Sequence, residues 1–335
     1  MSTYNNGGII AWVKNNPTSS GYYDLYIGSD TIIRGLNLAY YFDNMTQVDS
    51  INFSNLDTSL TMDMHRMFYN TGANSTTFKL NLGNNFDTTN VTDMSAMFYQ
   101  TGYNSTGFTL NLGDKFDTTN VTNMSSMFMR TGNNSTKITL DLGSKFNTEN
   151  VTNMSKMFAL LGRYSPNFEL KLGDKFATSK VTDMQELFNE VGSANETFTL
   201  NLGDLFDTSN VTNMTKMFRK TGLKSTTFKL NLGNYFNTSK VTNMASMFEH
   251  TGYSNESFTL DLGNSFNTKE VKDMNNMFSS TGYSSTVFTL DLGDLFDTSK
   301  VTNMSGMFEY LGHKSKIMKL DLGEKFNTSS VVNMS

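Results

Sequence analysis

Histidine is the side chain best suited to general acid–base chemistry near neutral pH, and the 335-residue chain contains three: His65, His250 and His313. The repeat described below separates His65 from His250 by six coils, or roughly 30 Å at ~4.8 Å per coil. No catalytic pair or triad of histidines is therefore expected. Because cysteine is absent, disulfides, thiol chemistry and cysteine-bound metals are excluded as well. The sequence predicts a protein that is not an enzyme.

Carboxylates recur at one place in the repeat, as Asp141, Asp261, Asp291 and Asp321. The last three belong to consecutive repeats, so they are expected to stack ~4.8 Å apart on a sheet face. Either a calcium ion bridges their oxygens, or solvent and Lys319 relieve the repulsion. We expect no tight metal site and no cofactor.

These residues are positioned by a 30-residue repeat, for which Val121–Asn150 serves as the example. Nine complete units run from residue 61 to residue 330, and residues 331–335 begin a tenth. We number positions 1 to 30 within each unit, with Val91 and Val121 at position 1. A period of this length predicts a solenoid or a propeller, and head-to-tail coils favour the solenoid.

Each unit is expected to contain one short helix. Apolar residues at positions 1, 4, 7 and 8 have helical spacing, and Thr, Leu or Val at position 11 closes the pattern. Position 3 is always Asp or Asn, as in Asp93, which is typical of a helix N-cap. Position 12 is always Gly, as in Gly102, which is typical of the residue that ends a helix.

A strand is expected to follow. Apolar and polar residues alternate over Phe108–Leu112, and Gly follows at position 23 in every unit. Successive strands should then pair in parallel as one continuous sheet on one face of the solenoid, with the short helices on the other. Position 26 is always Phe and position 28 always Thr, which indicates a buried anchor and a hydroxyl that satisfies backbone groups.

Residues 1–60 differ from the repeats. β-prone runs at 9–13 and 22–27 flank a segment rich in turn residues, which predicts a β-hairpin. A degenerate first coil follows. We therefore predict an N-terminal cap at 1–60, which covers the end of the stack, and a solenoid at 61–335.

The segment Phe116-Asp-Thr-Thr-Asn-Val-Thr-Asn-Met-Ser-Ser-Met-Phe128 resembles the repeat of the BspA-like leucine-rich-repeat surface proteins of bacteria. The resemblance covers about residues 38–335. It implies a leucine-rich-repeat-like α/β solenoid, a location at the cell surface or outside the cell, and roles in adhesion. It brings no catalytic residues. The units here are longer than is usual for that family, around residues 131–136 and 143–145.

Composition narrows the range of partners. The net charge is −5 and no run of Lys or Arg occurs, so nucleic acid is not expected. No apolar run is long enough to span a membrane. Residues 1–8 do not have the pattern of a signal peptide, so we expect either that the protein is not exported by that route or that it is cut from a longer precursor.

Positions 9, 10, 13 and 14 vary most between units, and we call them the ridge. Aromatic residues and arginine dominate protein-binding surfaces. We therefore predict a binding or adhesion solenoid that engages a protein or glycan on a host or neighbouring cell; the alternative is a structural rod or self-assembling spacer. The candidate contact residues are Tyr69, Tyr99, Tyr103, Arg130, Arg163, Tyr164, Arg219, Tyr253, Tyr283 and Tyr310.

The tenth unit comprises only Val331 to Ser335 and stops before the Met-Phe pair of positions 7 and 8. The ninth coil is then expected to present an uncovered apolar end and an unpaired strand edge. Either the native chain continues beyond Ser335, which we favour, or the end docks on another copy. In both cases we predict weak end-to-end association of this chain into a homodimer.

Overall fold

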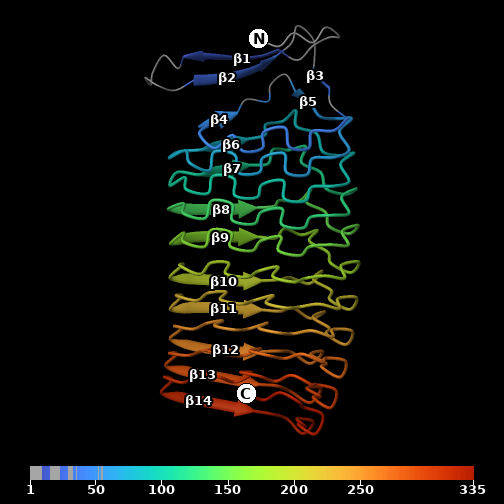
Figure 1. Cartoon of the computed structure of the whole chain (residues 1–335), viewed down its shortest axis with the longest axis vertical. Helices are drawn as coiled ribbons and strands as arrows, with labels where there is room; N and C mark the ends of the chain where they lie inside the picture. Colours follow the sequence, from blue (N-terminus) through green and yellow to red (C-terminus); the bar gives the residue numbers. More distant parts are fainter. Residues whose placement is uncertain (1–9, 16–22, 29–32, 35, 52, 54–55) are drawn as a thin grey trace.

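The computed structural model describes residues 10–15, 23–28, 33–34, 36–51, 53 and 56–335. In this part of the chain the repeats form a stack of flattened coils along the longest axis of the molecule (Figure 1). The remaining residues of the predicted cap lie outside the described ranges. No helix among the described residues is long and apolar enough to cross a membrane.

Strands mark one side of the stack. In the N-terminal part, β1 and β2 pair as antiparallel strands, and β3 pairs with β5 in parallel. The strands are β1 (Ile10–Asn15), β2 (Tyr23–Gly28), β3 (Ile33–Arg34), β4 (Ser50–Ile51), β5 (Leu56–Asp57), β6 (Lys79–Asn81), β7 (Thr109–Asn111), β8 (Lys137–Asp141), β9 (Asn167–Lys171), β10 (Thr197–Asn201), β11 (Thr227–Asn231), β12 (Ser257–Asp261), β13 (Val287–Asp291) and β14 (Ile317–Asp321).

The parallel solenoid is confirmed, and the register is the one that the repeat predicts. Phe198 in β10 lies opposite Phe228 in β11, and equivalent positions face each other in every pair of neighbouring repeat strands that is joined. The expected continuous sheet is wrong, however. The repeat strands pair as β4–β6–β7, β8–β9, β10–β11 and β12–β13–β14, with breaks before β8, β10 and β12. Leu110, Leu170 and Leu230, next to these breaks, are only partly buried.

The expected short helices are also wrong, because the structure assigns no helix to any described residue. At even positions the backbone N–H leaves its own coil: Ala96 donates to the carbonyl of Ser125 at 2.8 Å and Gln100 to that of Met129 at 2.9 Å. Both residues have left-handed backbone angles, with φ of 51° and 55°, which a right-handed helix excludes. The segment is a series of tight turns that are hydrogen-bonded to the next coil.

The interior consists of aligned aromatic columns. At position 8 the rings of Phe98 and Phe128 stack with centroids 5.3 Å apart, and at position 26 those of Phe116 and Phe146 are 6.2 Å apart. Buried threonines at position 28 donate to carbonyls of the next coil, as Thr88 does to Asp117 at 2.7 Å. The predicted buried anchor and backbone-satisfying hydroxyl are thus observed.

Asp and Asn bend the chain at three places in each coil. Asp93 at position 3 accepts a hydrogen bond from the N–H of Ser95 at 2.7 Å, and Asp87 at position 27 accepts one from that of Thr89 at 2.9 Å. Asp261 at position 21 accepts one from the N–H of Gly263 at 2.9 Å. The side chain expected as a helix N-cap therefore closes an Asx turn.

In the last complete coil, every residue of β14 is exposed. Met318 and Leu320 are each 39% exposed, although their equivalents in earlier coils are mostly buried. The end-to-end association predicted from the sequence stays a prediction.

Candidate functional site

The backbone places the ridge positions along one line of the stack. Position 10 has a left-handed backbone in Arg130, Glu190 and His250, with φ of 61°, 61° and 58°. Its N–H donates to the next coil, as Glu190 does to the carbonyl of Arg219 at 2.7 Å. Side chains at positions 9 and 10 consequently stack on their counterparts at the coil spacing.

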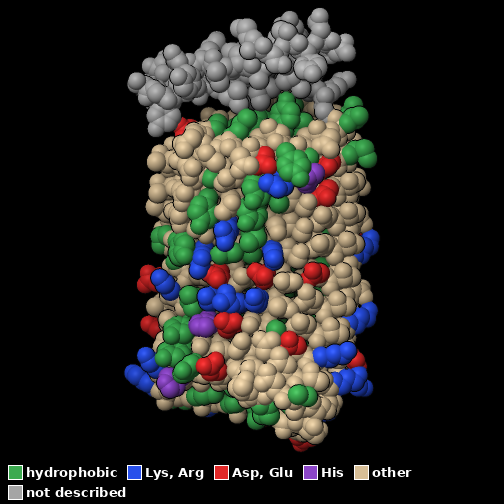
Figure 2. All heavy atoms as spheres, viewed as in Figure 1, with side chains coloured by type: hydrophobic (Ala, Val, Ile, Leu, Met, Phe, Trp, Pro, Cys, Tyr) green, Lys and Arg blue, Asp and Glu red, His purple; other side chains and the backbone are tan. Residues whose placement is uncertain are grey.

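Positions 5 and 6 belong to the same surface. Arg66 at position 6 lies over the ring of Tyr69 at position 9, with 3.9 Å between the guanidinium carbon and the ring centroid. It also forms an ion pair with Asp43 at 3.2 Å. We call the ridge together with positions 5 and 6 of residues 61–330 the variable face; Figure 2 shows charged and hydrophobic side chains gathered along it.

Two tyrosine stacks lie toward opposite ends of this face. The rings of Tyr69 and Tyr99 are nearly parallel with centroids 4.6 Å apart, and those of Tyr253 and Tyr283 have the same separation. Burial, followed by the neighbouring tyrosine, raises the pKa of the hydroxyls of Tyr69 and Tyr253. These hydroxyls therefore remain neutral donors at physiological pH.

The second stack continues toward the last repeat. His250 stacks on Tyr253 at 5.5 Å, and Tyr283 contacts His313 at 5.6 Å. Tyr310 lies edge-on to Tyr283 and is 54% exposed.

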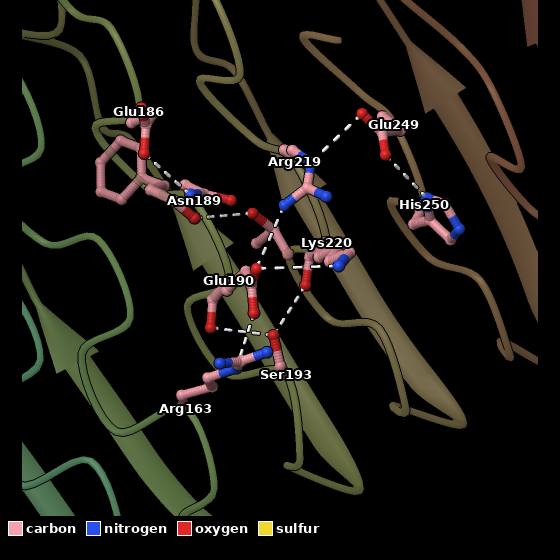
Figure 3. A network of polar contacts seen from close by, with 11 residues as sticks. Arg163, Glu186, Asn189, Glu190, Ser193, Arg219, Lys220, Glu249 and His250 are labelled. Carbon is pink, nitrogen blue, oxygen red and sulfur yellow. Dashed lines mark hydrogen bonds and ion pairs between the residues drawn. The ribbon is translucent and has the colours of Figure 1, made fainter. Parts of the chain in front are cut away.

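Between the two stacks lies a network of charges centred on Glu190 (Figure 3). Arg163, Arg219 and Lys220 approach its carboxylate from the preceding and following coils, at 2.6, 3.1 and 3.8 Å. The side chain of Glu190 is only 8% exposed. A buried carboxylate without counter-charges is costly, and these three cations supply the counter-charges.

Arg219 links this carboxylate to a second one. Its Nε donates to Glu249 at 3.1 Å, and Nδ1 of His250 lies 3.3 Å from the same carboxylate. Burial opposes ionisation of Glu249, but the contacts with His250 and Arg219 outweigh it and lower its pKa to about 2. Glu249 is therefore anionic at all physiological pH values.

The structure brings most of the predicted contact residues together. Tyr69 with Tyr99, Tyr253 with Tyr283 and Tyr310, and Arg163 with Tyr164 at 4.8 Å are in contact. Arg163 and Arg219 meet at Glu190. Tyr103 and Arg130 lie on the same face and are half-buried.

The sequence reasoning missed Arg66, Glu190, Lys220, Glu249 and His250 as site residues. A signal for four of them was present, because they occupy ridge positions 9 and 10. Arg66 lies at position 6, outside the four ridge positions.

The stacked aspartates do not form a separate centre in the described residues. Asp261, Asp291 and Asp321 lie in register across β12, β13 and β14. Each carboxylate accepts a hydrogen bond from the glycine two residues later, at 2.9 to 3.0 Å. In the part of the chain that the structure describes, no group of three or more His, Asp or Glu is arranged to hold a metal ion. The expectation that calcium does not bind tightly stays a prediction.

A cavity of about 440 Å³ opens at the first break in the strand column, between β7 and β8. Phe108, Leu110, Ile138 and Leu140 contribute to its lining together with several threonines. Lys137 is the one ionisable residue among the described residues of its lining.

Comparison with protein-family models matches almost the whole repeat region. The family described as "Mycoplasma protein of unknown function, DUF285" matches residues 36–163, 100–221, 129–256, 163–287, 195–319 and 282–335. The overlapping matches reflect the internal repeat. No curated protein and no solved structure matches the chain.

Proposed function

Because the chain belongs to the family described as Mycoplasma protein of unknown function, DUF285, its function has to be inferred from its surface, and we propose that it is a non-enzymatic binding solenoid. The variable face would engage a protein or glycan on a host or neighbouring cell. We place it at the cell surface or outside the cell, on the resemblance of residues 116–128 to BspA-like surface proteins.

One observation carries this proposal: the residue types typical of binding surfaces are concentrated on the variable face. Seven of the eight tyrosines in residues 61–330 lie there, as do four of the five arginines of the whole chain and all three histidines. Elsewhere the repeats keep the same Phe, Met, Thr, Asn and Gly from coil to coil. Packing and turn formation account for those repeated residues, but they do not account for the tyrosines and arginines, which binding interfaces favour.

A structural rod is the alternative. It is favoured by the uninterrupted hydrogen bonding between coils, which runs through positions 4 to 10 from the first repeat to the last. A spacer needs this rigidity, but it needs no tyrosine stacks.

The test is a screen of the labelled chain on protein and glycan arrays and on intact cells. The variant Tyr164→Ser with Tyr310→Ser removes two ridge rings that are 50% and 54% exposed. Its matched control, Tyr235→Ser with Leu205→Ser, removes side chains that are 59% and 50% exposed at position 25, off the variable face. We expect a saturable partner whose binding the first variant loses and the control keeps.

Two results would argue against the proposal. Self-association with no other partner on arrays or cells favours the rod. Equal loss of binding in both variants places the contact surface outside the variable face.

A further inference from the structure

Charge is distributed unevenly between the variable face and the rest of the chain. The six positions of that face carry nine Lys or Arg against four Asp or Glu, a net charge of +5 on a chain whose net charge is −5. The remainder holds 17 Lys or Arg against 27 Asp or Glu. The face is therefore a positive stripe on an acidic protein, which attracts negatively charged partners.

The negative charges of this face are largely used within the protein. Glu190 is held by Arg163, Arg219 and Lys220, Glu249 by Arg219, and Glu186 lies 3.9 Å from Lys156. The fourth, Glu309, is exposed in the last complete repeat. An incoming partner thus meets few uncompensated carboxylates in the middle of the stripe.

Several cations of the same stretch have no counter-charge. Among the described residues, no carboxylate lies within ion-pair distance of Arg130, Lys216 or Lys224, and Nε of Arg130 is buried without a hydrogen-bond partner. Backbone hydrogen bonds join every coil in this stretch to the next. The coils of Arg130 and Lys216 are three apart, an axial separation of roughly 14 Å at ~4.8 Å per coil.

The tyrosines indicate which kind of anion fits. Nucleobases stack on aromatic side chains through the flat faces of the rings. In Tyr69 with Tyr99, and in Tyr253 with Tyr283, the rings lie face to face within 6° of parallel, so each ring has one of its two faces covered by its neighbour. Hydroxyl and guanidinium donors suit carboxylates, which are acceptors only.

We propose that the partner is an acidic protein segment, which lies on the variable face between the coil of Arg130 and the coil that holds both Lys216 and Lys224, and pairs its carboxylates with these three cations. This rests on the proposed binding function and specifies its partner class. An extended chain rises ~3.3 Å per residue, so four or five residues span the axial separation between the coil of Arg130 and the coil of Lys216. The tyrosine hydroxyls on either side donate to the flanking parts of the segment.

The experiment measures the binding of a fluorescent peptide of about eight glutamates to the full chain by anisotropy. We expect saturable binding that weakens between low and physiological salt, since exposed charges are screened. The triple variant Arg130→Gln, Lys216→Gln, Lys224→Gln should raise the Kd about tenfold or more. The control Lys115→Gln, Lys145→Gln, Lys175→Gln makes the same change in net charge at exposed residues of position 25 and should change the Kd by less than about twofold.

Heparin, an oligothymidylate and a peptide of serines serve as competing probes. Tighter binding of heparin or the oligonucleotide through the same three cations overturns the assignment to an acidic protein segment, and leaves the binding function intact. Equal weakening by both triple variants overturns it too, because net charge alone then explains the binding. If the glutamate peptide does not bind at low salt, the assignment to an acidic protein segment is overturned as well. The proposed binding function is tested separately, by the screen on arrays and cells. Equal melting temperatures of the two triple variants confirm that both remain folded.

Discussion

Nη1 of Arg219 donates a 3.1 Å hydrogen bond to the carboxylate of Glu190, which lies 29 residues earlier in the chain and one coil away. In Arg219→Met, Glu190 keeps Arg163 and Lys220 but loses the cation that it shares with Glu249. We expect the free energy of unfolding to fall by about 1–2 kcal/mol, less than the 3–5 kcal/mol typical of a fully orphaned buried charge. Urea unfolding measures it.

The control for this prediction is Lys156→Met. It breaks the pair with Glu186, in which the atoms are 3.9 Å apart and the lysine side chain is 40% exposed. Exposed pairs contribute below about 1 kcal/mol. If the free energy of unfolding falls equally in both variants, the Glu190 network contributes no more to stability than an exposed ion pair.

The depressed pKa of Glu249 predicts a pH dependence. Its usual value is 4.5 and its folded value about 2, so it stabilises the fold above the unfolded pKa, and this contribution is lost as the pH falls from about 5 toward 2. At neutral pH it is on the order of 2–3 kcal/mol.

Because other carboxylates titrate in the same range, the measurement compares wild type with Glu249→Gln. We expect the difference in unfolding free energy between the two to be largest near pH 7 and to shrink toward pH 2. A difference that stays constant over this range would contradict the assigned pKa.

Alanine substitutions at two glycines of position 23 distinguish the destabilisation caused by backbone strain from that caused by steric overlap. Gly203 and Gly233 both have φ of +78°, but a Cβ on Gly233 would lie 2.6 Å from the carbonyl oxygen of Gly203, whereas one on Gly203 meets nothing within 4 Å. We expect Gly203→Ala to cost about 1–2 kcal/mol for the left-handed backbone alone. Gly233→Ala should cost clearly more, since the backbone oxygen has to move.

Thermal or urea unfolding of the two alanine variants checks this. Gly203→Val should also destabilise strongly, because a β-branched residue is more strained than alanine at positive φ. Equal losses in Gly203→Ala and Gly233→Ala would show that the coils shift apart without cost.

Ala177 occupies the one position 27 in residues 61–330 that lacks a side-chain acceptor. In the neighbouring coil, Asn147 accepts a hydrogen bond from the N–H of Glu149 at 2.9 Å. We expect Ala177→Asn to restore this Asx turn toward the N–H of Ser179 and to stabilise the chain by about 0.5–1 kcal/mol. The reverse change, Asn147→Ala, should destabilise by a similar amount; a gain in both would refute the role assigned to position 27.

Much of the architecture was predictable from the sequence. The invariant Phe at position 26 and the alternation of Phe198, Leu200 and Leu202 correctly predicted buried columns and parallel strands in register. The assignment of a helix at positions 4 to 11 was wrong for a physical reason. Apolar residues spaced three and four apart also result when tight turns repeatedly direct a side chain inward, and only the destination of each N–H distinguishes the two structures.

The candidate site was predictable in part. Variation at positions 9, 10, 13 and 14 was enough to place Tyr69, Tyr99, Arg163 and Arg219 on one surface. Burial of the Glu190 carboxylate was not predictable, because it requires cations from two neighbouring coils. The breaks before β8, β10 and β12 have no signal in the repeat either, since the strands on both sides have nearly the same sequence.

These breaks give the stack two mechanically different sides. Along the turns, each coil is tied to the next by several backbone hydrogen bonds without interruption, whereas the strand side is divided into separately paired groups. A pull along the axis is therefore carried by the turns, and the strand side lengthens first, at its breaks. We therefore expect the stack to bend in one preferred direction, with the variable face on the side that resists stretching.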